Sequence, residues 1–137
     1  MNLIRTLFDQ AFNQGNLAVV DELVSVDSPA HIPGWGTPAN RLGLKQMIVN
    51  LRAGFPDFQC TVDDEIEGAG KFAAIWTLRG THQGSFFGNL PTGRRIEVQG
   101  FIFARVDKEK MIENWLLLDQ MNLLQQIGVV PPPRGIA

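Results

Sequence analysis

An acidic side chain stands at the end of an apolar strand pattern near the C-terminus. Alternate residues of a β-strand point to the same face, so Trp115, Leu117 and Asp119 are expected to share one face of a strand. A carboxylate that is desolvated in an apolar cavity becomes a stronger base, able to take a proton from a carbon next to a carbonyl group. The next segment, 121–127, is predicted to be a helix, which Asp119 could instead cap. Both roles stay open.

A histidine occupies a similar place in an earlier predicted strand. Trp76, Leu78 and His82 fall on one face of that strand, among mostly apolar neighbours. A histidine near a carboxylate can orient it, relay protons or donate a hydrogen bond to an oxyanion. It can equally be a structural residue whose hydrogen bonds are satisfied within the protein. The other histidine, His31, lies in a predicted loop beside Trp35.

No metal or cofactor is expected. The two histidines are far apart and show no metal-ligand spacing with each other or with a glutamate. The single cysteine, Cys60, excludes an intrachain disulfide and a multi-cysteine metal site, and it suits a reducing cytoplasm. Because the chain has no tyrosine, an oxyanion would have to be met by His82, a tryptophan N–H, an asparagine or ordered water.

Segment 84–95 combines three glycines and a proline with two adjacent phenylalanines. This composition indicates a loop with special backbone angles, and it lacks the Gly-Lys-Ser/Thr ending of a phosphate-binding loop. Such a loop can cover an apolar pocket, or its phenylalanines can simply pack on the core. The aromatic residues expected to line a pocket are Trp35, Phe55, Phe87 and Trp115.

Hydrophobic periodicity predicts the elements that carry these residues. Apolar residues recur at helical spacing in 3–12 and 17–24, behind possible caps at Asn2 and Asn16, and again in 44–51, before Pro56. After a predicted loop at 29–38 and this third helix, alternation predicts strands over 58–63, 72–83, 95–106 and 111–118. We therefore expect an α+β fold in which N-terminal helices pack on one face of a curved antiparallel sheet.

Two of these strands are apolar on both faces. Segments 100–106 and 115–118 lack the polar residue at every second position that a solvated face would show. Helices can cover one face, so we expect the other face to lie against a second copy of the chain in a homodimer. The pattern does not decide whether the face that carries Asp119 points toward the helices or toward the partner.

Length and composition indicate one soluble globular domain, residues 1–137. Hydrophobic residues make up 45% and charged residues 19%, which argues against disorder and against a membrane span. The 12 Lys and Arg against 14 Asp and Glu form no basic stripe, so no nucleic-acid partner is expected. Charged residues interrupt segment 1–12, unlike the apolar stretch of a signal peptide, so no export is expected and the cytoplasm is the predicted compartment.

The motifs Gly80-Thr-His-Gln-Gly, Phe87-Gly, Pro91-Thr-Gly-Arg-Arg and Glu113-x-Trp115-x-x-x-Asp119 are followed by Leu123-Leu-Gln-Gln-Ile-Gly. Together they resemble the SnoaL-like polyketide cyclase family. This family belongs to the nuclear transport factor 2-like superfamily, whose fold is a cone-shaped, half-open curved sheet on N-terminal helices, a cystatin-like α+β barrel. The resemblance implies cofactor-free intramolecular aldol ring closure of a polyketide ester. It matches Asp119 to the family's acid/base carboxylate, and His82 and His31 to its cavity histidines.

We therefore expect a small enzyme that acts on a hydrophobic carbonyl compound, with Asp119 as general base and then acid. His82 would orient Asp119 or stabilise the enolate. The alternative is a non-catalytic module that binds a lipophilic small molecule in the same cone, and a third possibility is a partner-binding dimer with a collapsed cavity. The substrate stays open, as does the choice among aldol closure, isomerisation, dehydration and hydrolysis.

Overall fold

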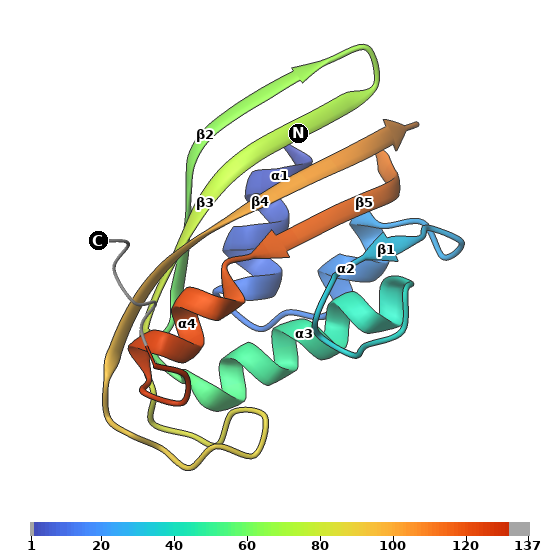
Figure 1. The fold of residues 1–137 in the computed structure, drawn as a ribbon. Helices are drawn as coiled ribbons and strands as arrows, with labels where there is room; N and C mark the ends of the chain where they lie inside the picture. Colours follow the sequence, from blue (N-terminus) through green and yellow to red (C-terminus); the bar gives the residue numbers. More distant parts are fainter. Residues whose placement is uncertain (1, 132–137) are drawn as a thin grey trace.

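A curved five-stranded sheet is the framework of the computed structural model, which describes residues 2–131 (Figure 1). Its strands are β1 (Ala30–His31), β2 (Gln59–Gly68), β3 (Lys71–Thr81), β4 (Arg95–Asp107) and β5 (Lys110–Leu118), in the order β1-β5-β4-β3-β2. Neighbouring strands are antiparallel, except that β1 runs parallel to β5. The long strands bend around the N-terminal helices (Figure 1), which confirms the predicted α+β architecture.

The helices occupy the predicted segments. α1 (Leu3–Thr6) continues as a π-helix, η1 (Leu7–Phe12), and is followed by α2 (Ala18–Leu23), α3 (Arg41–Gly54) and, after β5, α4 (Gln120–Gln126). The predicted cap at Asn2 is confirmed, because its side chain accepts a hydrogen bond from the backbone N–H of Arg5 at 2.9 Å. Within residues 2–131, no helix is both long and apolar enough to cross a membrane.

Two local expectations are wrong. The N-cap of α2 is Leu17 and not Asn16, and no side chain caps this helix. Asn16 contributes its main-chain carbonyl instead, which accepts a hydrogen bond from Val19 N–H at 3.2 Å. Residues 30–31, predicted to lie in a loop, form β1 through pairing of Ala30 with Asn114 on β5. A strand of two residues is too short to show alternation, so it left no pattern in the sequence.

The sheet has an inner face, covered by helices, and an outer face. Side chains of β4 alternate between the two, and the inner ones are buried. On the neighbouring strand, the ring of Trp76 lies 5.2 Å from that of Phe8 and 6.3 Å from that of Phe12, measured between centroids. The hydrophobic core therefore lies between the inner face and the N-terminal helices. The outer face carries Phe101 and Leu117, about half exposed, which is why both faces of these strands are apolar in sequence.

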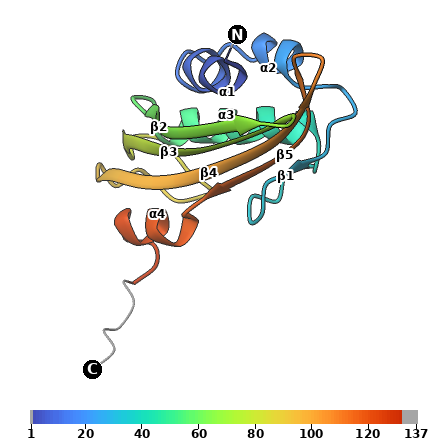
Figure 2. The ribbon, with the colours of Figure 1, turned by 90° about the horizontal axis from the view of Figure 1, so that it is seen from above.

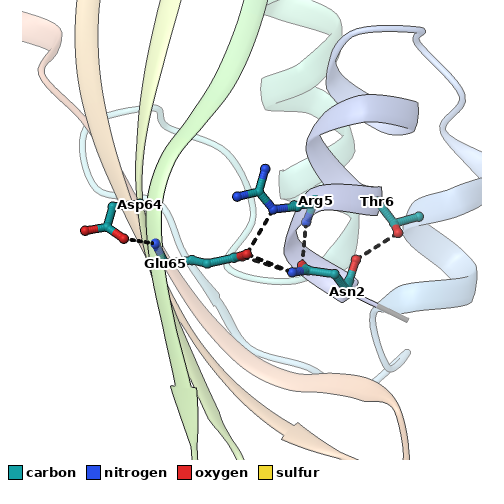
Figure 3. A network of polar contacts seen from close by, with 5 residues as sticks. All are labelled: Asn2, Arg5, Thr6, Asp64 and Glu65. Atoms are coloured by element: carbon teal, nitrogen blue, oxygen red, sulfur yellow. Dashed lines mark hydrogen bonds and ion pairs between the residues drawn. The ribbon is translucent and has the colours of Figure 1, made fainter.

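Polar contacts join the start of α1 to β2 (Figure 3). The Glu65 carboxylate accepts hydrogen bonds from Nδ2 of Asn2 and from Nε of Arg5, each at 2.9 Å. Partial desolvation of this carboxylate would raise its pKa, but the hydrogen bonds from Arg5 and Asn2 outweigh that effect, and the pKa of Glu65 is lowered. The ionised form of Glu65 thus ties the N-terminal helix to the sheet.

The C-terminal helix continues the sheet edge where β5 stops. β5 ends at Leu118, opposite Gly100, so the earlier residues of β4 have no strand on that side. In Figure 2, α4 lies beside β4 in line with the end of β5. The side-chain amide of Gln126 accepts from the backbone N–H of Glu97 at 2.8 Å and donates to the carbonyl of Glu97 at 2.9 Å. One glutamine therefore makes the pair of hydrogen bonds that a neighbouring strand would make.

Candidate functional site

A buried histidine lies among aromatic rings directly after β3. His82 is fully buried, and its backbone pairs across the loop with Arg94 and Gly93 at 2.9 Å each. The imidazole centroid lies 5.5 Å from the ring of Phe55, which lies 5.1 Å from the ring of Phe86. An apolar shell of this kind excludes water and strengthens any hydrogen bond made inside it.

Thr92 determines which nitrogen of His82 carries the proton. The backbone N–H of Thr92 points to Nδ1 at 3.2 Å, and its hydroxyl lies 3.0 Å from the same atom. A backbone N–H can only donate, so Nδ1 accepts and the neutral ring carries its hydrogen on Nε2. That Nε2–H is buried and meets no acceptor among residues 2–131. It is a buried hydrogen-bond donor that the described residues leave unpaired.

Trp35 supplies a second donor of the same kind. Its side chain is buried, 4% exposed, against Phe86 and Phe87 at centroid distances of 5.9 and 5.2 Å. The indole Nε1–H also has no acceptor in the described part of the chain. Ring contacts thus connect Trp35, Phe86, Phe55 and His82 in one aromatic cluster with two unpaired N–H donors.

A pocket of about 250 Å³ opens beside this cluster. Phe86 and Phe87 of the glycine-rich loop form one wall, and Leu123 and Leu124 of α4 form another. Gly34 forms part of the lining where the loop before α3 meets α4, and a Cβ at this glycine would come within 2.3 Å of the Gln120 side chain. Phe86 belongs both to the pocket wall and to the cluster that contains His82. The glycine-rich loop therefore does cover an apolar pocket.

Asp119 lies on the opposite face from His82. Its side chain accepts a hydrogen bond from Asn122 N–H at 3.1 Å, as the N-cap of α4, and it is exposed. Around it is a polar hollow that Thr77, Arg79 and Gln99 of the outer face also line. The structure thus shows the capping interaction and does not bring Asp119 and His82 together. The acid/base role of Asp119 stays a prediction.

His31 and Trp115 also belong to the outer face. Nε2 of His31 lies 2.9 Å from Oε2 of Glu113, and the imidazole stacks on the indole of Trp115 at a centroid distance of 4.8 Å. Both side chains are partly exposed, at the edge where β1 joins β5. Of the predicted site residues, the structure therefore brings together His82, Phe55, Trp35 and Phe87, and it places Asp119, His31 and Trp115 across the sheet.

Two participants were not predicted. For Phe86 the only sequence signal is that it stands next to Phe87, and this signal does not say which of the two rings packs inward. Thr92 belongs to the Pro91-Thr-Gly-Arg-Arg motif, which is a marker of the family. Its role depends on a backbone N–H that reaches back ten residues to His82, and no sequence pattern encodes such a contact.

Other reactive groups lie away from this site. Burial raises the pKa of the Cys60 thiol far above its ordinary value, so this residue is a protonated core side chain and not a nucleophile. Within residues 2–131, no group of three or more His, Cys, Asp or Glu side chains could hold a metal ion. The site itself offers the N–H donors of His82 and Trp35 in an apolar setting.

Comparison with known proteins agrees with the fold. The chain is 34% identical to IdmH, a proposed polyketide cyclase from Streptomyces antibioticus, over 93% of this chain and 96% of that one, with a TM-score of 0.81. AclR, a proposed hydroxylase from Streptomyces galilaeus, shares the fold at 23% identity and a TM-score of 0.83, over 96% and 82% of the two chains. A proposed polyketide cyclase from Bacillus cereus shares the fold at 23% identity and a TM-score of 0.81, over 93% of this chain and 79% of that one. No curated protein matches the chain.

The family model for SnoaL-like polyketide cyclases matches residues 2–127, nearly the whole chain. The structural neighbours named as cyclases have the same helices-on-sheet architecture, that of the nuclear transport factor 2-like fold. Family model, fold and solved relatives lead to one conclusion: the chain belongs to the SnoaL-like polyketide cyclase family.

Proposed function

We propose that the protein is a cofactor-free cyclase that acts on a hydrophobic, polyketide-like carbonyl compound. One observation carries this proposal: His82 is fully buried, and its Nε2–H meets no acceptor among the described residues. A buried donor without a partner is costly unless a ligand satisfies it. A substrate carbonyl oxygen has the required chemistry, and the family and the IdmH likeness support the same reaction class.

The proposed step is enolate formation followed by carbon–carbon bond formation. A base removes a proton from the carbon next to the carbonyl group, and the C–H electron pair moves into a new C=C bond while the carbonyl oxygen becomes an enolate. His82 Nε2–H and Trp35 Nε1–H would stabilise that oxyanion. The enolate carbon then attacks a second carbonyl carbon of the same molecule, and the oxygen formed there takes up a proton.

The family resemblance assigns the base to Asp119. For that role its carboxylate would have to leave Asn122 N–H and turn from the outer face toward the pocket, whose wall begins at the next residue, Gln120. The donor role of His82 and Trp35 is supported by their buried, unpaired N–H groups, whereas the base role of Asp119 is supported by the family resemblance alone.

The test uses 1-tetralone, a bicyclic ketone, in deuterated water. The wild-type protein should accelerate the exchange of its α-protons for deuterium, measured by mass spectrometry. His82→Phe and Trp35→Phe remove one N–H donor each and keep an aromatic ring, so both should slow the exchange, by about 100-fold for His82. Melting temperatures close to the wild-type value would show that the folds are intact. Binding of 1-tetralone without any acceleration would instead favour the non-catalytic binding module.

We also propose that two copies of the chain pair through their outer sheet faces, in the cytoplasm. An apolar hollow of about 490 Å³ lies on this face, lined by residues that include Ile66, Ile75, Phe101, Phe103, Trp115 and Leu117. Ile66 is 72% exposed and Phe101 is 53% exposed. Apolar surface of this extent on a β-sheet is typical of an interface.

Ion pairs border the hollow at both ends. Arg105 pairs with Glu113 at 3.7 Å at one end, and Arg79 pairs with Glu97 at 2.6 Å at the other. An apolar centre with a polar, charged rim is the usual anatomy of an interface between two chains. A second copy of the chain would cover the apolar centre and leave these ion pairs at the rim.

A further inference from the structure

A tight turn in the glycine-rich loop holds an aromatic residue in an unfavourable backbone conformation. Phe86 N–H donates to the Asn89 carbonyl at 3.1 Å, and Asn89 N–H donates to the Phe86 carbonyl at 2.9 Å. The two residues between them have positive φ, +47° at Phe87 and +77° at Gly88. This is the geometry of a type I′ turn, in which asparagine or glycine is preferred at both central positions. A phenylalanine there has a backbone cost that its neighbour Gly88 does not have.

The strained residue presents its ring to the pocket and not to solvent alone. The side chain of Phe87 is about half exposed and lines the pocket between the turn and α4. Its ring also makes edge contacts with Trp35 at 5.2 Å and with Phe86 at 4.7 Å, measured between centroids. Strain of this kind persists where the surrounding structure holds it, and it gathers at functional sites. An asparagine would give the turn its preferred residue, but it would remove the aromatic wall.

The opposite wall is apolar as well. Leu123, Leu124 and Val129 line the pocket across from Phe87, and the amide side chains of Asn89 and Gln120 supply polar groups. Asn89 is engaged in the turn, where its Nδ2 donates to the Phe86 carbonyl at 3.0 Å. A volume of about 250 Å³ between an aromatic ring and aliphatic side chains suits a flat system of about two fused rings.

We propose that Phe87 is the specificity-determining residue of this pocket, which binds the apolar fused-ring part of the substrate. Phe87 in the pocket wall contacts Trp35, so a ring held in the pocket would direct an attached carbonyl group toward the indole N–H of Trp35. His82 lies farther away, beyond Phe86 and Phe55. This inference rests on the proposed function for the identity of the ligand's carbonyl group, but binding of the apolar part can be measured without it.

The experiment separates the pocket assignment from the proposed function by using two probes. Tetralin, a bicyclic hydrocarbon, tests the pocket alone, and 1-tetralone adds the carbonyl group. The chain has three tryptophans, so its NMR spectrum has three indole N–H signals, and Trp35→Phe identifies the one that contacts Phe87. We expect tetralin to shift the Trp35 signal in a saturable way, and Phe87→Asn to weaken this binding about tenfold or more.

The melting temperature of Phe87→Asn distinguishes a binding role of the ring from a structural role. If the ring is kept for binding, Phe87→Asn should melt at the wild-type temperature or above it, because relief of backbone strain offsets the lost contacts. A lower melting temperature, or unchanged tetralin binding, would overturn the proposal.

The turn between β4 and β5 offers the matched control, since Lys108 and Glu109 also have positive φ, +50° and +63°. Glu109→Gly relieves strain in that turn and should leave tetralin binding unchanged.

Tetralin binding that depends on Phe87, together with no catalysed exchange of 1-tetralone, would refute the proposed function and leave the pocket assignment standing.

Discussion

Trp76 lies directly over Gly100, its register partner on the neighbouring strand. A Cβ built at Gly100 would come within 2.3 Å of Cζ2 of this indole and 2.6 Å of the Leu117 carbonyl oxygen. Glycine is therefore required here for space, since the ring occupies the volume that any other side chain would fill. The largest aromatic side chain of the core depends on the smallest residue of β4.

Gly100→Ala should destabilise the fold by about 1–3 kcal/mol, because Trp76 must move in a close-packed core. Unfolding in urea, followed by tryptophan fluorescence, measures this change. Gly68→Ala is the matched control, since a Cβ there meets no atom within 4 Å. Equal stability of the two variants would mean that the indole does not lie over Gly100.

Glu65 should make the fold sensitive to acid. Its pKa is lowered from 4.5 in the folded state, so its stabilising contribution is complete above that value and is lost as pH falls through the lower folded-state pKa. Glu65→Gln should therefore flatten the decline of stability below about pH 5, measured by urea unfolding at several pH values. Glu67→Gln makes the same charge change at an exposed position of β2 and should keep the wild-type decline.

The two possible roles of Asp119 can be separated by two substitutions. Asparagine caps helices about as well as aspartate, whereas alanine does not, so Asp119→Asn should keep the melting temperature and Asp119→Ala should lose about 1 kcal/mol. Thermal unfolding measures both. Slower α-proton exchange in Asp119→Asn at an unchanged melting temperature would establish the family's acid/base role for this carboxylate. A destabilised Asp119→Asn would contradict the capping interaction.

Phe101 should control the state of association. Phe101→Lys places a charge in the middle of the outer face, so we expect the molar mass to change from that of two chains to that of one. Sedimentation equilibrium measures it. Val49→Lys, at a similarly exposed position on α3, should leave the mass unchanged. A wild-type protein that sediments as a monomer at all concentrations would refute the proposed dimer.

Much of the fold was predictable because its long elements bury one face in a regular pattern. The four long strands follow a period of 2 residues and the α-helices a period of about 3.6, which burial enforces. That residues 7–12 form a π-helix was not predictable from this pattern. β1 was not predictable, since two residues hold no pattern and its pairing with Asn114 depends on a segment more than 80 positions away.

The site was only partly predictable, for a physical reason. Alternation shows that Trp115 and Asp119 share a face, but not which face, and here both faces are apolar. The structure places that column outside, because the other column of β5, which contains Asn114 and Leu116, is the buried one. His82 was found by its position in the inner column, whereas the burial of Trp35 arises from contacts with a loop 50 residues later.

The replacement of a strand by α4 has a consequence for solubility. The exposed edge of a sheet can add a strand from another molecule and so begin aggregation. At Glu97 the side-chain amide of Gln126 occupies this edge. Two residues further along β4, the backbone carbonyl of Gln99 accepts a hydrogen bond from Asp119 N–H at 3.1 Å. A helix cannot itself be extended by strand addition. The C-terminal helix thus closes this part of the sheet edge to strand addition while it forms one wall of the pocket.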